Sequence, residues 1–239
     1  MLKVTNKRMK IMINYLNKNQ LAKPVIIVIP FIILFILQIL HLDSDPSPII
    51  RWGTMSDEGF WQHNARMKIM FGNFCTDEFR MAYLGAPIFN QFLYISYKLL
   101  GISLFSARIL NVISYCFILI MIFYLLNRKF GTKNALISTF LFGFMHEMLM
   151  YVNWSTPVIL ELCFLLAIIY FYQLGIHKCK DTYLLLSGIS YSCAVLSKLT
   201  SVLFILSLGI FFALEIHYKR CNYRKIIWFI YGVLLVFIP

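Results

Sequence analysis

The chain has 239 residues, of which 60% are apolar and 13% are charged, and its formal net charge is +12. A soluble domain usually has about 25% charged residues, so this composition, with a mean hydropathy of +0.76, excludes an ordinary soluble domain. The basic residues stand in short clusters between long apolar blocks, as they do in membrane proteins, and we therefore expect no nucleic-acid binding.

The N-terminal segment, residues 1–23, contains six lysines and arginines and no acidic residue. By the positive-inside rule, this end is cytoplasmic. An apolar block follows, and no small-residue cleavage site comes after Leu40, where the next residues are His41, Leu42 and Asp43. We therefore predict a retained signal-anchor helix at about residues 24–41.

A long first outer loop, about residues 42–105, follows this helix. Its last part, residues 88–104, is amphipathic and is interrupted by Asn90, Gln91, Lys98 and Gly101. If this stretch crossed the membrane, the later basic clusters at residues 128–133, 178–180 and 219–225 would all lie outside, against the positive-inside rule. The sequence therefore predicts an interfacial helix that lies on the membrane.

Six further apolar blocks predict six more spans. They cover about residues 106–126, 134–152, 157–176, 182–197, 199–217 and 226–239. The predicted fold is an all-α, multi-pass bundle of about seven spans, with residues 24–239 forming one transmembrane module. The last block has 14 residues, which is short for a span that needs roughly 20, so we expect the chain to be the N-terminal part of a longer protein.

Six of the ten acidic residues lie in the first outer loop. We interpret Asp43, Asp45, Asp77 and Glu78 as solvated loop residues. The pair Asp57–Glu58 differs because Gly59, Phe60 and Trp61 follow it and surround it with apolar mass. A carboxylate in such a setting is a candidate general base, although an acidic pair alone is a weak signal.

Four charged residues approach the same outer face from four different spans. Arg108 opens the second span, Lys198 lies between the fifth and sixth, and Glu147 and Glu161 lie near the outer ends of the third and fourth. Charge in a bilayer is costly and often functional, although Arg108 and Lys198 could instead extend to the headgroups. Together these residues predict an outer-leaflet cavity for a lipid with a phosphate, which Arg and Lys would bind.

Three segments carry a resemblance to a known family. They are SDEGFW at residues 56–61, YLGAPIFNQFLYISYKLLGISLFSARILNVI at residues 83–113, and CAVLSKLTSVLF at residues 193–204. Their order and spacing resemble the GT-C glycosyltransferases, which include protein O-mannosyltransferases and aminoarabinose transferases. The resemblance covers about residues 24–215. The chain departs from the family pattern in having Ala86 before Pro87, where two prolines are frequent, and Glu161 where Asp is frequent.

The resemblance implies that a sugar moves from a polyprenyl-phosphate donor to a lipid, glycan or protein acceptor on the extracytoplasmic side. It implies that Asp57 and Glu58 are the catalytic carboxylates, and that Arg108 and Lys198 bind substrate; Glu161 joins them because it lies on the same outer face. We expect a bacterial cytoplasmic membrane as the location.

Other readings remain open. The chain could be a transporter or another non-catalytic membrane protein, or a truncated copy that binds a partner, but the sequence shows no internal repeat of the kind found in many transporters. There is no P-loop or GxGxxG motif, and the histidines do not cluster, so we expect no cofactor and no metal. The six cysteines contain no CxxC pair and predict packing rather than a disulfide framework.

Overall fold

The computed structural model describes residues 22–40, 42, 54–75, 78, 80–178, 180–218 and 223–237, without the side chains of residues 22–28, 54–57 and 223–224. Every regular element in these ranges is helical. The helices are α2 (Ala22–Leu40), α3 (Thr54–Phe71), α4 (Arg80–Gly85), α5 (Pro87–Leu100), α6 (Leu104–Gly143), α7 (His146–Val152), α8 (Pro157–Lys178), α9 (Asp181–Ser197), the 3-10 helix η2 (Leu199–Leu203), α10 (Phe204–His217) and α11 (Tyr223–Phe237).

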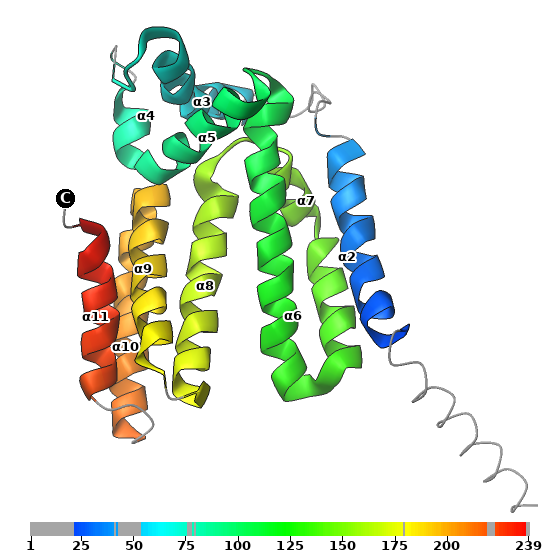
Figure 1. Cartoon of the computed structure of the whole chain (residues 1–239), viewed down its shortest axis with the longest axis vertical. Helices are drawn as coiled ribbons and strands as arrows, with labels where there is room; N and C mark the ends of the chain where they lie inside the picture. The colour runs from blue at the N-terminus through cyan, green and yellow to red at the C-terminus, as the bar shows by residue number, and fades with distance from the viewer. Residues whose placement is uncertain are drawn as a thin grey trace, which may run out of the picture.

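The long helices run side by side and form an all-α bundle (Figure 1). Within the described residues, α6, α8 and the η2–α10 stretch are long and apolar enough to cross a membrane, and Ile29–Leu40 and Lys225–Phe237 form shorter apolar helices. The protein is therefore an integral membrane protein. The expected fold class, a multi-pass helical bundle, is confirmed.

Helix α6 comprises two of the predicted spans. Its two arms meet at Gly131, which has a φ of 77°, so the backbone there is not helical. A positive φ is readily adopted only by glycine, and the chain reverses direction at this point (Figure 1). The arm before Gly131 and the arm after it thus correspond to the predicted second and third spans.

The third predicted span, residues 134–152, is shorter than expected. The long helix ends at Gly143, and the rest of the predicted span forms the separate short helix α7. The Tyr115 hydroxyl, on the other arm of α6, donates a hydrogen bond to the Gly143 carbonyl at 2.8 Å. Gly143 also packs closely, because a Cβ there would lie 2.7 Å from Leu34. This contact fixes the helix end, and apolar periodicity could not predict it.

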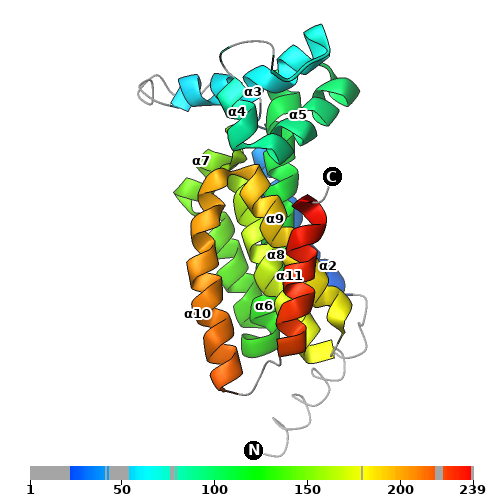
Figure 2. The ribbon, with the colours of Figure 1, turned by 90° about the vertical axis from the view of Figure 1, so that its left-hand side faces the viewer.

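Helices α3, α4 and α5 lie together across one end of the bundle, and we call these three helices the cap (Figure 2). Proline at the first position begins α5, and Gly101, with a φ of 80°, ends it. Helix α5 therefore lies at the end of the bundle and does not cross it. The other end of the bundle, where α6 reverses and α8 meets α9, is called the distal end.

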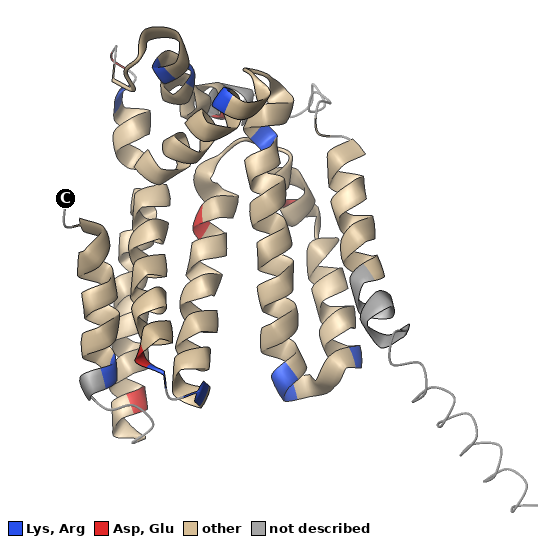
Figure 3. Cartoon of the chain, in the orientation of Figure 1, with Lys and Arg blue, Asp and Glu red and all other residues tan. Residues whose placement is uncertain are grey.

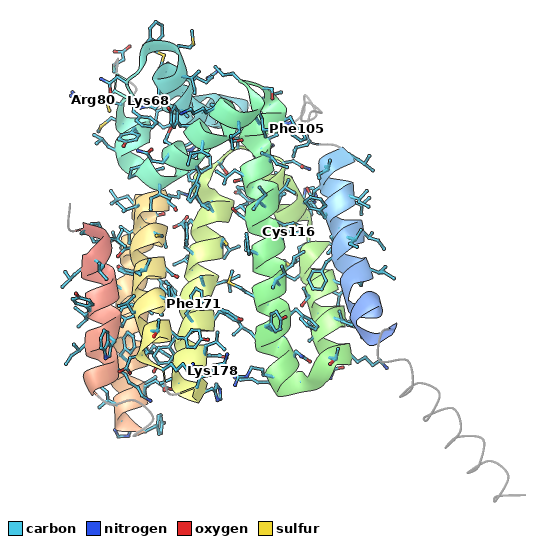
Figure 4. The ribbon with its side chains drawn as sticks, viewed as in Figure 1. Lys68, Arg80, Phe105, Cys116, Phe171 and Lys178 are labelled. Atoms are coloured by element: carbon cyan, nitrogen blue, oxygen red, sulfur yellow. The ribbon has the colours of Figure 1, made fainter. Side chains whose placement is uncertain are left out.

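Charged residues gather at the cap and at the distal end, and few lie between them (Figure 3). Lys68 and Arg80 lie in the cap, whereas Lys178 lies at the distal end (Figure 4). Apolar side chains fill the bundle between these ends, and many of them face outward, such as Phe117, Leu141 and Leu206. An apolar middle between two charged ends is what a bilayer requires.

Candidate functional site

The centre of the candidate site is a buried ion pair between Arg108 and Glu58. The Arg108 Nε and Nη2 atoms donate to the two Glu58 carboxylate oxygens at 2.9 and 3.0 Å, and Nη1 donates to the Leu42 carbonyl at 2.7 Å. Arg108 is 1% exposed and Glu58 is 7% exposed. This bidentate geometry is the strong form of an arginine–carboxylate pair, and it fixes the cap helix α3 to the bundle helix α6.

The position of Arg108 follows from the start of α6. Ser103 and Ser106 form a reciprocal capping box, in which the Ser103 hydroxyl accepts from the Ser106 amide at 3.1 Å and the Ser106 hydroxyl accepts from the Ser103 amide at 3.0 Å. Such a box satisfies amide groups that the first turn leaves without partners. Helix α6 therefore begins directly below the cap, and Arg108, one turn further on, faces α3.

The buried segment between α7 and α8 adds a third partner. The Ser155 amide donates to Glu58 Oε1 at 2.9 Å. The Asn111 side-chain amide, on α6, donates to the Thr156 carbonyl at 3.2 Å and also to the Trp154 carbonyl. Asn111 thus holds this segment against α6, and the segment in turn holds the Glu58 carboxylate.

A second polar cluster lies where α9 ends and η2 begins. Glu161, on α8, accepts hydrogen bonds from the Ser201 hydroxyl at 2.6 Å and from the Thr200 hydroxyl at 3.1 Å. Lys198 directly precedes η2 in extended backbone conformation. Its side chain is half-buried, and it makes no hydrogen bond or ion pair with any residue that the structure describes. Lys198 is therefore a cation available to an anionic ligand.

The first turns of α8 connect the two clusters. Ser155 contacts Glu58 just before α8 begins, and Glu161 contacts η2 one turn into α8. Leu160 packs in one apolar cluster with Ala65 of α3 and Phe89 of α5. The structure thus brings Glu58, Arg108, Glu161 and Lys198 to the cap end of the bundle.

Asp57 lies in α3, directly before Glu58, and its side chain is among those not described. Asn64 lies further along the same helix. Asn64 is fully buried, and its side-chain nitrogen and oxygen have no hydrogen-bond partner. Asn64 is a polar residue near the site that the sequence did not single out.

Tyr97, on α5, connects the cap internally. Its hydroxyl donates to Gln62 Oε1 at 3.1 Å. Burial raises the pKa of Tyr97, with a smaller lowering by Arg66. The hydroxyl therefore stays protonated and remains a donor to α3 at all physiological pH values, which keeps α5 and α3 in register.

The sequence analysis gave no role in the site to Asn111, Ser155, Thr200 or Ser201, which position the charged residues. No sequence pattern could have identified Ser155, because it acts through its backbone amide. Thr200 and Ser201 did have a signal, because they directly follow Lys198 and carry hydroxyl groups in an apolar block. Glu147, which the sequence placed on the same outer face, lies exposed in α7. In the described residues, no group of histidine, cysteine and acidic side chains is arranged to hold a metal.

Comparison with known proteins identifies the family. The sequence profile of the dolichyl-phosphate-mannose-protein mannosyltransferases matches residues 85–239, which is more than half of the chain. The chain belongs to this family. The resemblance to GT-C glycosyltransferases is confirmed, and Arg108, Glu161 and Lys198 lie within the matched residues. Asp57 and Glu58 precede them. No curated protein sequence matches the chain.

The fold of this family member is also similar to a solved structure. The crystal structure of ArnT from Cupriavidus metallidurans bound to undecaprenyl phosphate matches with a TM-score of 0.67 and 14% sequence identity. The match covers 91% of this chain, including most of the cap and the bundle, but 41% of ArnT. The chain thus spans less than half the length of ArnT.

Proposed function

We propose that this membrane glycosyltransferase family member transfers a sugar from a polyprenyl-phosphate donor to an acceptor hydroxyl at the cap end of the bundle. The cap end faces the extracytoplasmic side of a bacterial cytoplasmic membrane. The main support for the proposal is the buried Glu58–Arg108 ion pair, because it holds α3, the helix that contains Asp57, at the cap end of the bundle. The crystal structure of ArnT contains undecaprenyl phosphate, which supports a lipid phosphate as the donor class.

Asp57 is the proposed general base. It would accept the proton of the acceptor hydroxyl while the bond between the sugar and the donor phosphate breaks. Glu58 supports it without taking the proton, because its two oxygens already accept three hydrogen bonds, from Arg108 and Ser155. Burial of this pair is expensive unless both partners remain in place, so α3 has little freedom to shift.

Lys198 is the proposed ligand of the donor phosphate. Glu161 acts through η2, since it binds the hydroxyls of Thr200 and Ser201 and so orients the backbone next to Lys198. Arg108 contributes positive charge at the same end of the bundle. Its Nε, Nη1 and Nη2 atoms all bind protein groups, so its main contribution to substrate binding is to hold the cap in place.

The proposal is tested by Asp57→Asn, which keeps the size of the side chain but cannot accept a proton. Loss of a general base typically lowers the rate by about 10²–10⁴-fold. We expect kcat to fall at least about a hundredfold in membranes that contain the protein, a polyprenyl-phosphate sugar and an acceptor, while donor binding persists. The matched control is Asp77→Asn, the same change in a carboxylate of the same loop.

The control should keep nearly normal turnover. Equal loss in Asp57→Asn and Asp77→Asn, or normal turnover in Asp57→Asn, would show that the base lies elsewhere. A transporter would instead move the sugar lipid across the membrane without forming a new glycosidic bond. Product analysis of the same membranes separates the two functions.

A further inference from the structure

A cavity of about 720 Å³ lies in the distal half of the bundle, away from the cap. Its walls come from α8, α9 and α10, and α6 contributes Lys129, which lies two residues before the turn at Gly131. Figure 2 shows α10 beside α8 and α9 in this region. The Tyr172 ring, on α8, lies against the Phe211 and Phe212 rings of α10 at centroid distances of 4.9 and 5.6 Å. Aromatic side chains thus join α8 to α10 beside the cavity.

The cavity opens to the surface of the bundle that faces lipid. Ser207 and Phe211 line it from α10, Ile169 lines it from α8, and all three residues are exposed. Ligand cavities typically have volumes of about 300–1,000 Å³. This cavity is therefore large enough for the headgroup and the upper chains of one lipid, which reaches it sideways from the bilayer.

The lining combines an apolar part with two groups that can bind an anion. Ile168 and Leu208 belong to the apolar part, whereas Lys129 and His177 line the cavity towards the distal end. Both are exposed, and neither makes a hydrogen bond or ion pair with any residue that the structure describes. A lysine ammonium group donates hydrogen bonds, and an imidazole has at least one N–H donor in either protonation state. The cavity therefore offers two donors to an anion beside one apolar volume.

Glu215 also lines the cavity, but its carboxylate has a partner within the protein. The Tyr172 hydroxyl donates to Glu215 Oε2 at 3.3 Å. A ligand is therefore not needed to satisfy Glu215, and the groups that select the ligand are Lys129 and His177.

Basic side chains also dominate the distal end of the bundle around the cavity (Figure 3). Six described lysines and arginines lie there, against two acidic residues. The basic residues are Arg128, Lys129, Lys133, Lys178, Lys180 and Lys225, and the acidic ones are Asp181 and Glu215. Basic pockets between membrane helices bind anionic lipid headgroups. The charge of this end therefore favours a headgroup with a net negative charge.

We propose that this cavity binds one anionic glycerophospholipid of the phosphatidylglycerol type, from the leaflet at the distal end of the bundle. Lys129 and His177 donate hydrogen bonds to its phosphate. The acyl chains lie against Ile168 and Leu208 and leave the cavity past Ser207. This site is independent of the proposed transferase site, which lies at the other end of the bundle.

Charge separates this lipid from others of similar shape. Phosphatidylethanolamine has the same phosphate, but its headgroup brings an ammonium group to an end of the molecule that is already basic. Diacylglycerol has the same chains but lacks the phosphate that Lys129 and His177 would bind. Both lipids should therefore bind more weakly than phosphatidylglycerol.

The test is native mass spectrometry of the whole purified chain with phosphatidylglycerol, phosphatidylethanolamine or diacylglycerol at equal concentration. The wild-type protein should retain phosphatidylglycerol best and diacylglycerol least. Lys129→Gln should lower the retention of phosphatidylglycerol roughly fivefold, since one basic residue near an anionic lipid has an effect of this size. The same change should remove the preference over phosphatidylethanolamine.

The matched control is Lys133→Gln, because Lys133 is an exposed lysine on the other side of the turn at Gly131 and does not line the cavity. It removes the same charge from the distal end, and it should leave the retention of phosphatidylglycerol nearly unchanged. Equal losses in Lys129→Gln and Lys133→Gln would mean that the basic surface as a whole attracts the lipid, and would overturn the proposal.

Ser207→Trp tests the cavity itself, because it fills the opening without changing charge. It should displace the lipid at an unchanged unfolding temperature, since Ser207 is exposed. Unchanged retention in Ser207→Trp would contradict the proposal, as would equal retention of phosphatidylglycerol and phosphatidylethanolamine by the wild type. Soluble glycerol 3-phosphate at the same concentration should not compete. Equal competition would assign the site to a free phosphate ester and exclude a lipid ligand.

Discussion

A buried arginine at the start of a membrane span requires partners for its charge and its donors. Arg108 finds them in Glu58 and in the Leu42 carbonyl. The sequence predicted that Asp57, Glu58 and Arg108 belong to one site, but it could not predict that Glu58 binds Arg108 directly. The two residues are 50 positions apart, and their pairing depends on how α3 folds back over α6.

The ion pair predicts a strong coupling between Glu58 and Arg108. Glu58→Gln or Arg108→Met should each lower the free energy of unfolding by about 3–5 kcal/mol, because one buried charge loses its partner. The double variant Glu58→Gln/Arg108→Met should lose much less than the sum. Thermal unfolding in detergent measures these differences, with Arg80→Met, an exposed arginine of the cap, as the control. Additive losses would mean that the pair does not stabilise the fold.

Lys198 leads to a different kind of prediction, because its role concerns substrate. Lys198→Met should raise the KM for the donor roughly tenfold or more, since a hydrogen bond to a charged group contributes about 1.5–3 kcal/mol. The unfolding temperature should stay close to that of the wild type. Lys98→Met is the matched control, because Lys98 is an exposed lysine at the cap end. If both variants kept the wild-type KM, Lys198 would not bind the phosphate.

At the scale of the elements, α9 and α11 approach each other so closely that glycine is required at two positions. A Cβ on Gly188 would lie 2.0 Å from the Phe229 carbonyl oxygen, and a Cβ on Gly232 would lie 2.2 Å from the Leu185 carbonyl oxygen. The Ser192 hydroxyl donates to the Val233 carbonyl at 2.9 Å across the same interface. Small residues that let backbones approach are typical of helix pairs in membranes.

The interface predicts that Gly188→Ala and Gly232→Ala each separate α9 from α11 and lower the unfolding temperature. Overpacking of this kind typically costs about 1–3 kcal/mol. Gly209→Ala provides the control, because a Cβ at Gly209 on α10 meets no atom within 4 Å. That change should be neutral or slightly stabilising, since alanine favours helices more than glycine by about 1 kcal/mol. Equal changes in unfolding temperature for Gly188→Ala, Gly232→Ala and Gly209→Ala would show that α9 and α11 do not pack this closely.

Most helices of the bundle were predictable because they lie in long apolar blocks, and the cap helix α5 was predictable from its amphipathic pattern. The total of about seven spans stays a prediction. The two helices of the cap that precede α5, namely α3 and α4, were harder to predict, because their sequences are polar and carry no clear period. The end of α6 at Gly143 depends on Tyr115 and Leu34, which are distant in sequence. Apolar blocks in the sequence therefore indicated where the long helices lie, whereas the end of α6 depends on tertiary contacts.

For the whole molecule, the positive-inside rule predicts that the distal end lies in the cytoplasm and the cap outside. In a cysteine-free background, Glu78→Cys should react with a membrane-impermeant thiol reagent added to intact cells, and Arg128→Cys should react only after lysis. Both positions are exposed, Glu78 in the cap region and Arg128 near the turn at Gly131. The opposite labelling pattern would reverse the topology and place the candidate site in the cytoplasm.

The Glu58–Arg108 pair also bears on the order in which the protein is made. Synthesis runs from the N-terminus, so Leu42 and Glu58 leave the ribosome before Arg108. When the first arm of α6 enters the bilayer, its arginine can therefore meet a carboxylate that is already present. The Ser155 amide, which completes the shell of Glu58, is made 97 residues after that carboxylate. The hydrogen bonds to Glu58 can therefore be complete only after the segment between α7 and α8 has been made.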